Sequence, residues 1–98
     1  MVNSIDDIKR IINDDRDVLN SRYPIKSLGV FGSYARGEQT KGSDIDILIE
    51  FSRPIGLLAF IRLENELKSL LGAKVDLVTK KALKPRIGKH ILKEVVRI

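Results

Sequence analysis

Cysteine and tryptophan are absent from this sequence of 98 residues, and histidine occurs once. Without cysteine the chain can form no disulfide and no thiolate metal site, so the simplest expectation is a protein of the reducing cytoplasm. Long apolar runs are missing too, since no stretch approaches the roughly 20 apolar residues that a membrane-spanning helix needs. The first ten residues turn acidic where a signal peptide would be apolar, and no secretion signal is expected.

The length suits one compact domain with one modest core, and we expect residues 1–98 to form it. Composition is ordinary for a globular protein, with 43% apolar and 32% charged residues. No internal repeat or low-complexity linker interrupts the chain.

The net charge of +5 is divided unevenly along the chain. Residues 1–50 hold 7 Lys and Arg against 9 Asp and Glu, a balance of −2, whereas residues 51–98 hold 11 against 4, a balance of +7. An acidic first half and a basic tail are compatible with a polyanionic ligand, with an acidic protein partner, or with solubility alone.

Helical spacing is clear in three segments. Ser4 can cap a first helix that ends before Tyr23, because a residue preceding proline avoids the helical region. A second amphipathic helix is expected over 57–71, with Gly72 placed to end it. From residue 85 onward, apolar positions on one side and Lys or Arg every four residues on another predict a basic amphipathic helix that continues to the end of the chain.

Three apolar segments between these helices are expected to be strands, at 27–31, 44–51 and 74–79. With a short helical turn after the first strand, the element order is α-β-α-β-α-β-α. This order predicts an α/β (α+β) fold in which a small mixed sheet is flanked by helices.

Gly32 and Ser33 directly follow the first expected strand. A residue without a Cβ allows a sharp turn or a close approach of the backbone to a ligand. We expect Ser33 to be the N-cap of the short turn 34–36, which Gly37 can end. Free backbone N–H groups at such a turn suit a phosphate, although a Gly-Ser turn often serves only as a connection.

Asp44 and Asp46 flank one isoleucine at the start of the second expected strand. Alternate strand side chains share a face, so the two carboxylates are expected on one side, about 6.5 to 7 Å apart along the backbone. Like charges so close raise at least one pKa unless a cation lies between them, and Mg²⁺ prefers such oxygen ligands. The alternative is a solvated strand edge with Asp as a turn residue.

Asp76 interrupts the otherwise apolar third strand. If this strand pairs beside 44–51, three carboxylates converge and can hold two metal ions about 3.5 to 4 Å apart for an in-line displacement at phosphorus. A solubilising role at a strand edge is the alternative for Asp76.

Gly32-Ser33, ten residues, then Asp44-Ile45-Asp46 resembles the G-S-x10-D-x-D signature of the DNA polymerase beta-like nucleotidyltransferase superfamily. More closely, GVFGSYARGEQTKGSDIDILIEF followed by KVDLVT resembles the minimal nucleotidyltransferases, the antitoxins of prokaryotic HEPN/MNT toxin–antitoxin pairs. The resemblance covers residues 26–98 and departs from the signature at no position.

The resemblance implies a Mg²⁺-dependent enzyme with two metal ions and ATP as substrate. Asp44 and Asp46 would bind the metal, and Asp76 would complete the cluster and orient or deprotonate the attacking hydroxyl. The implied reaction is transfer of AMP from ATP to a tyrosine of a HEPN ribonuclease toxin, which silences the toxin.

The same resemblance implies a nucleotide-binding role for Gly32 and Ser33, which would hold the triphosphate. Arg36 and Ser43 lie within the signature and are candidates for phosphate contact, although Arg36 could instead pair with Glu38 or an aspartate.

The short chain leaves little room for a domain that holds a second substrate, so we expect a partner protein to bring the acceptor. The basic C-terminal helix is a candidate docking face, with solvated charge as the alternative, and His90 is expected at the surface. Direct contact with nucleic acid and membrane association are not expected. Two other functions stay open: an antitoxin that blocks its partner by binding alone, and a transferase acting on RNA ends or a small hydroxyl compound.

Overall fold

The computed structural model describes residues 2–98. It contains a sheet, five α-helices and one turn of 3₁₀-helix. In chain order they are α1 (Ile5–Asp14), α2 (Arg16–Arg22), β1 (Ile25–Phe31), α3 (Ser33–Arg36), β2 (Ile45–Phe51), α4 (Leu57–Leu71), β3 (Val75–Thr79), η1 (Lys80–Ala82), α5 (Pro85–Glu94) and β4 (Val96–Arg97).

The sheet has four strands in the order β3-β2-β1-β4. β1 pairs antiparallel with both β2 and β4, whereas β2 and β3 run parallel, as expected for two strands joined through α4. The prediction of a mixed sheet flanked by helices is therefore confirmed. No helix within residues 2–98 is both long and apolar enough to cross a membrane.

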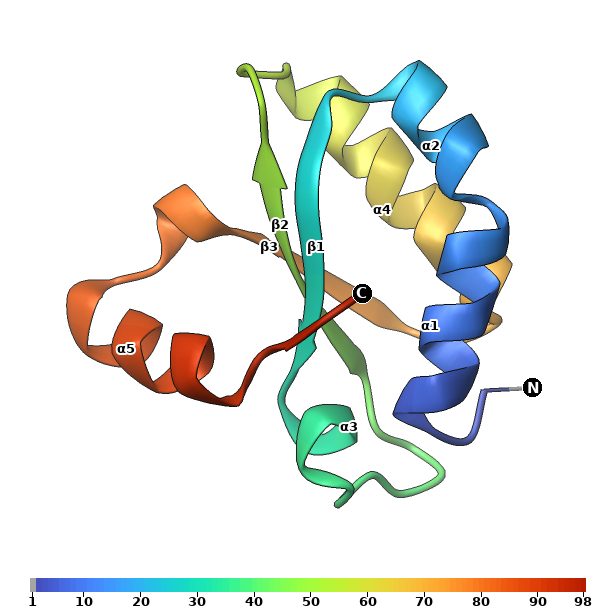
Figure 1. Ribbon diagram of the computed structural model, residues 1–98, viewed down its shortest axis with the longest axis vertical. Helices are drawn as coiled ribbons and strands as arrows, with labels where there is room; N and C mark the ends of the chain where they lie inside the picture. The colour runs from blue at the N-terminus through green and yellow to red at the C-terminus, as the bar shows by residue number, and fades with distance from the viewer. Residues whose placement is uncertain (1) are drawn as a thin grey trace.

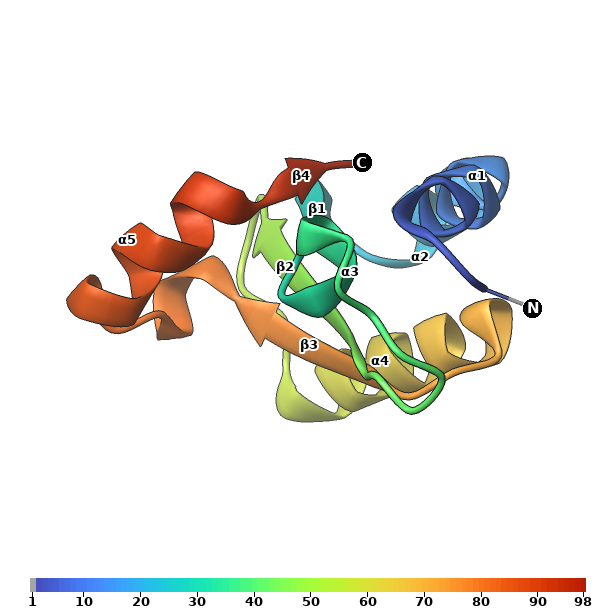
Figure 2. The same ribbon diagram turned by 90° about the horizontal axis from the view of Figure 1, so that it is seen from below.

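Helices α1, α2 and α4 cover one face of the sheet, and α5 lies on the other side (Figures 1 and 2). The core lies beneath α1 and α4, where the alternate β2 residues Ile45, Ile47 and Ile49 are fully buried together with Leu63 and Leu67 of α4. The period of two along β2 therefore sends its isoleucines and Phe51, which stacks edge-to-face on Phe60 of α4, toward the core, and it places Asp46 on the opposite face.

The first helical segment is two helices, not the single one that periodicity predicted. Ser4 caps α1 as expected, its hydroxyl accepting from the Asp7 N–H. The helix ends at Asp15, whose φ of −103° and ψ of 7° leave the helical region. Acidic residues are unfavourable at a helix C-terminus and favourable in a first turn, so the run from Asp14 to Asp17 favours ending α1 and starting α2 there.

The C-terminal helix was predicted to continue to the end of the chain, and this prediction is wrong. α5 ends at Glu94, and β4 pairs with Gly29 and Val30 of β1. The β-branched pair Val95-Val96 favours an extended chain, and glycine at 29 admits it, because a Cβ there would overlap Val95 Cγ2.

Two details of the predicted C-terminal helix change as a result. Arg97 lies in β4 and not on the basic helical face, and two of the residues assigned to the apolar side, Ile87 and Leu92, are 58% and 47% exposed. His90 is exposed, as predicted.

Candidate active site

Asp46 and Asp76 are direct neighbours across the parallel pair β2–β3. Neighbouring strands lie about 4.8 Å apart, and residues in register point to the same side. Because Ile45 and Val75 enter the core, both carboxylates lie on the opposite face, toward α5. Asp46 is half-buried and Asp76 is exposed.

Asp44 is exposed and lies one residue before β2, which begins at Ile45 and not at residue 44 as predicted. Its charge nevertheless reaches the same region, since Asp44 is one of the groups that raise the pKa of Asp46. Ser43 closes the preceding loop, where its hydroxyl accepts from the Thr40 N–H at 2.8 Å.

The turn after β1 brings the backbone against Asp46. Gly32 has a φ of 76° and a ψ of −152°, a conformation essentially restricted to glycine. A Cβ at this position would overlap the Asp46 carboxylate and lie 3.1 Å from its Cγ. Glycine is therefore needed at this position both for its backbone conformation and for the close approach of Asp46.

Ser33 is not the N-cap of the short helix. α3 begins at Ser33 itself, its N-cap is Gly32, and no side chain caps it. The reason is the positive φ of Gly32, which makes the chain turn one residue earlier than predicted, so the helix already begins at Ser33. Gly37 ends α3 in a left-handed conformation, as predicted.

Burial and neighbouring charge act together on Asp46. Desolvation is the largest cause that raises its pKa, followed by the charges of Asp76, Asp44 and Glu94, while Arg36 acts in the opposite direction. Four carboxylates thus share a region with one guanidinium. A bound cation would relieve this repulsion.

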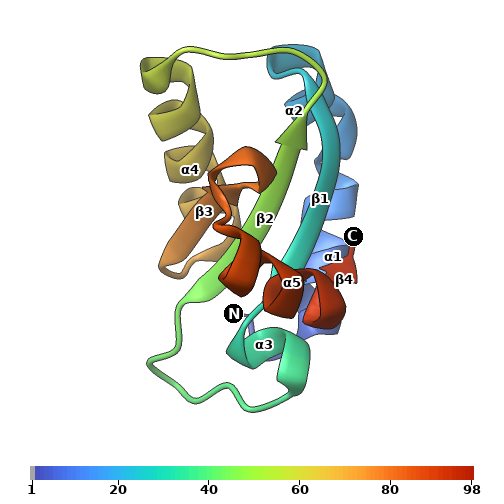
Figure 3. The same cartoon turned by 90° about the vertical axis from the view of Figure 1, so that its left-hand side faces the viewer.

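Glu94, which the sequence analysis did not single out, is the fourth of these carboxylates. The Gly32 N–H donates to Glu94 Oε1 at 2.9 Å, and Arg36 Nη1 donates to Oε1 and Oε2 at 3.2 and 2.9 Å. Figure 3 shows α5 crossing the sheet beside α3, which brings these residues together. In the sequence, Glu94 is distinguished only as the single acidic residue of a basic segment.

The donor set fits a magnesium ion by chemistry, since carboxylate oxygens are its preferred protein ligands and their charges repel without it. As placed within residues 2–98, no three carboxylate or imidazole groups lie close enough together to enclose a metal ion. Mg²⁺ is commonly held by one or two carboxylates together with water or phosphate oxygens, and Asp44 and Asp46 are the candidates here.

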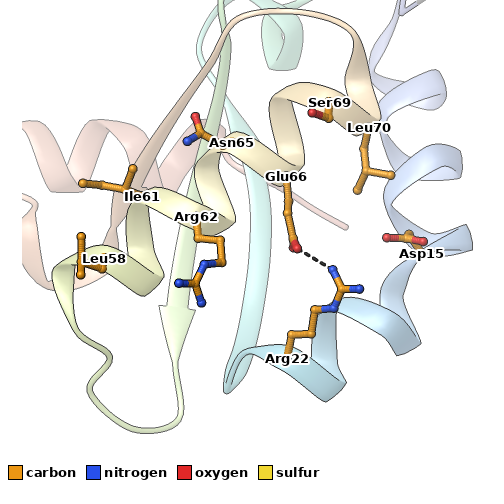
Figure 4. Close-up of a pocket in the computed structure, with 9 residues that line it drawn as sticks. All are labelled: Asp15, Arg22, Leu58, Ile61, Arg62, Asn65, Glu66, Ser69 and Leu70. Carbon is orange, nitrogen blue, oxygen red and sulfur yellow. Dashed lines mark hydrogen bonds and ion pairs between the residues drawn. The ribbon is translucent and has the colours of Figure 1, made fainter.

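Two surface hollows lie away from the Asp46–Asp76 pair. One of about 590 Å³ lies between α2 and α4, where Arg22 donates to Glu66 across it at 2.6 Å and Leu58 and Ile61 lie at its edge (Figure 4). The other, of about 650 Å³, is lined by Val2, Asn3 and Tyr34, by the loop 39–44, which includes Ser43 and Asp44, and by residues 72–74. Asp46 and Asp76 do not line either of these two hollows.

Comparison with known proteins shows the family of this chain. Residues 12–98 match the family model described as a nucleotidyltransferase domain. The protein adenylyltransferase MntA of Thermococcus cleftensis is 44% identical over 95 residues, with 97% of this chain and 96% of the relative covered. A protein of Methanocaldococcus jannaschii, provisionally named a protein adenylyltransferase, is 46% identical over 96 residues and covers 97% and 98% of the two chains.

Solved structures agree in fold. One, provisionally described as a minimal nucleotidyltransferase, is 34% identical with a TM-score of 0.76 and covers 93% of this chain and 95% of its own. A toxin–antitoxin structure with AMP-PNP is 26% identical with a TM-score of 0.73 and covers 87% and 69%. An MNT antitoxin complex with a tri-AMPylated HEPN toxin of Shewanella oneidensis shares the fold at 22% identity, a TM-score of 0.68 and coverage of 92% and 70%. The chain therefore belongs to the nucleotidyltransferase family and is an enzyme of that family.

Proposed function

We propose that residues 1–98 act as one minimal nucleotidyltransferase domain that transfers AMP from ATP to a tyrosine of a HEPN ribonuclease toxin, with Mg²⁺ as the metal. The observation that carries the proposal is the in-register pair Asp46–Asp76 beside the glycine-specific turn at Gly32. Relatives of the same length that are named protein adenylyltransferase support it.

The carboxylates divide the chemical work in this proposal. Asp44 and Asp46 hold the metal, with Asp76 completing the set. When bound, Mg²⁺ supplies positive charge that stabilises the negative charge developing on the phosphate oxygens. Asp76, the more exposed partner of the strand pair, orients the acceptor hydroxyl and takes its proton while the hydroxyl oxygen bonds to the α-phosphorus and pyrophosphate leaves.

The turn after β1 binds the triphosphate. Gly32 and Ser33 present the backbone at the end of β1, and Arg36 lies on the same turn with a guanidinium suited to phosphate oxygens. Ser43 is a further candidate for phosphate contact from the loop before β2. A related toxin–antitoxin structure with AMP-PNP supports nucleotide binding by this fold.

The acceptor comes from a partner protein in this proposal, and the partner's docking positions its tyrosine at the Asp46–Asp76 pair. Holding the two reactants in place supplies a large share of the rate in such reactions. The reaction is proposed to take place in the cytoplasm, in line with a sequence that has no cysteine.

The test is incubation of the purified protein with its co-expressed partner, Mg²⁺ and ATP labelled at the α-phosphate. Label on a tyrosine of the partner supports the proposal, and Asp46→Asn should abolish the labelling. Asp14→Asn, at an exposed position in α1, is the matched control and should label at the wild-type rate.

The same experiment separates the alternatives. Loss of the partner's ribonuclease activity without label would indicate an antitoxin that acts by binding alone. Label on RNA ends or on a small hydroxyl compound, with none on the partner, would indicate the third function. Either outcome contradicts transfer to a protein tyrosine.

A further inference from the structure

Glu94 binds to the donors that the proposed function assigns to phosphate. Its side chain is 19% exposed and contacts a turn 62 residues earlier in the chain. Its Oε1 accepts from the Gly32 N–H, and both of its carboxylate oxygens accept from Arg36 Nη1. The Glu94 carboxylate, an anion that belongs to the protein itself, is thus already bound to the Gly32 N–H and the Arg36 guanidinium.

The carboxylate is held as a charged group. Desolvation pushes the pKa of Glu94 upward, but the hydrogen bond from the Gly32 N–H, the hydrogen bond from Arg36 and the charge of Arg36 together bring the pKa below its ordinary value. A carboxylate and a phosphate both present oxygen acceptors with negative charge, and both form charge-assisted hydrogen bonds with these donors.

One backbone N–H makes one good hydrogen bond, so Gly32 cannot serve Glu94 and a phosphate at the same time. Glu94 also adds negative charge next to Asp46, where a polyphosphate would bring more. We propose that Glu94 is an internal latch, bound to Gly32 and Arg36, that must leave both groups before a nucleotide polyphosphate binds. The latch rests on the proposed function, because it regulates the same site.

The attachment of Glu94 allows it to leave. Glu94 is the last residue of α5, and Val95 and the two-residue strand β4 follow before the Ile98 N–H donates to Leu28 O at 3.0 Å. Ile87 and Leu92 of α5 are about half exposed, and no residue of α5 belongs to the buried hydrophobic core. Movement of the junction between α5 and β4 would release the carboxylate without unfolding the sheet.

The latch is tested with inorganic tripolyphosphate in the absence of metal, because this probe has no base or sugar. Isothermal titration compares the wild type with Glu94→Gln and Glu38→Gln. Glu38 is the matched control, since it also contacts Arg36, at 3.4 Å, and its substitution removes the same charge.

If Glu94 competes with tripolyphosphate, the apparent affinity for the probe equals the intrinsic affinity multiplied by the fraction of molecules in which Glu94 has left Gly32 and Arg36. Loss of the charge-assisted contacts is expected to tighten binding about tenfold in Glu94→Gln and less than twofold in Glu38→Gln. Equal affinities for the two variants, including no measurable binding by either, would overturn the latch.

A measurement on the wild type covers the case in which Glu94→Gln does not fold. In an NMR titration with tripolyphosphate, the Gly32 amide signal and the Glu94 carboxyl carbon should shift together as the ion pair opens. A shift of the Gly32 amide with an unchanged Glu94 carboxyl would contradict the latch.

Label transfer from ATP, measured on the same preparations, separates the two proposals. Tighter binding of tripolyphosphate by Glu94→Gln without any transfer to a partner supports the latch and rejects the transferase. Transfer with equal affinities in both variants rejects the latch and leaves the transferase in place.

Discussion

Replacing Gly32 by alanine examines the backbone conformation and the Asp46 contact together. A non-glycine residue at a φ of 76° and a ψ of −152° costs about 1–3 kcal/mol of conformational strain. The new Cβ would also overlap the Asp46 carboxylate, which has to turn away. We expect Gly32→Ala to lower the free energy of unfolding by about 2 kcal/mol and to abolish AMP transfer.

Two other glycines separate the causes. Gly37 has a φ of 71° with nothing within 4 Å of an added Cβ, so Gly37→Ala measures strain alone, about 1–2 kcal/mol. Gly42 lies in open space without a positive φ, and Gly42→Ala should stay within about 0.5 kcal/mol of the wild type.

The assay is urea unfolding followed by circular dichroism, together with labelling of the partner from ATP. If Gly32→Ala unfolds at the same urea concentration as Gly42→Ala, the inference of strain at this turn is wrong. If Gly32→Ala is destabilised but transfers AMP at the wild-type rate, the close approach of Gly32 to Asp46 is not part of the active site.

Three further predictions concern charge and core. Burial and like charges raise the pKa of Asp46, so the metal-free wild type loses stability as pH rises from below the ordinary value of 3.8 through the raised value. Asp46→Asn, which lacks this loss, should melt higher than the wild type at pH 7 without metal, and a lower melting temperature would contradict the repulsion. The hydrogen bond from the Asn3 N–H is the main cause that lowers the pKa of Asp7, so the stabilisation by the Asp7 carboxylate is present above pH 3.8 and lost as pH falls through the lowered pKa. In urea unfolding measured from pH 6 to pH 2, Asp7→Asn should lose less stability on acidification than the wild type. Parallel curves of unfolding free energy against pH for the two proteins would refute this prediction. Leu67 is fully buried, so Leu67→Ala should lower the free energy of unfolding in urea by about 2–5 kcal/mol. Leu58 is 77% exposed, so Leu58→Ala should lower it by less than about 0.5 kcal/mol. Similar losses for the two variants would contradict the assigned core.

Local sequence patterns were enough to predict the strands that bear Asp46 and Asp76. An aspartate between valine and leucine interrupts an apolar run, and the run has the length and composition of a strand. The parallel pairing of the two strands follows from the intervening helix 57–71. Those signals lie within a few residues of each carboxylate, which is why the sequence predicted the two strands, whereas their pairing stayed a condition.

Contacts between distant segments were not predictable in the same way. Glu94 lies 62 residues from Gly32, and within its own segment it resembles an ordinary solvated helix residue. Val95 and Ile98 also fit a helical period, and only pairing with β1 turns that segment into a strand. The break at Asp15 was missed because Ile12 and Leu19, seven residues apart, continue the apolar period across it.

The alternation of side chains along β2 gives neighbouring positions different physical roles. Substitutions at Ile45, Ile47 and Ile49 alter the packing of the core, whereas a substitution at Asp46 alters the charge on the opposite face of the sheet. Neighbouring positions of one strand therefore contribute to different surfaces of the protein. The seven residues of β2 thus combine a face that packs into the core with a face that carries the Asp46 carboxylate.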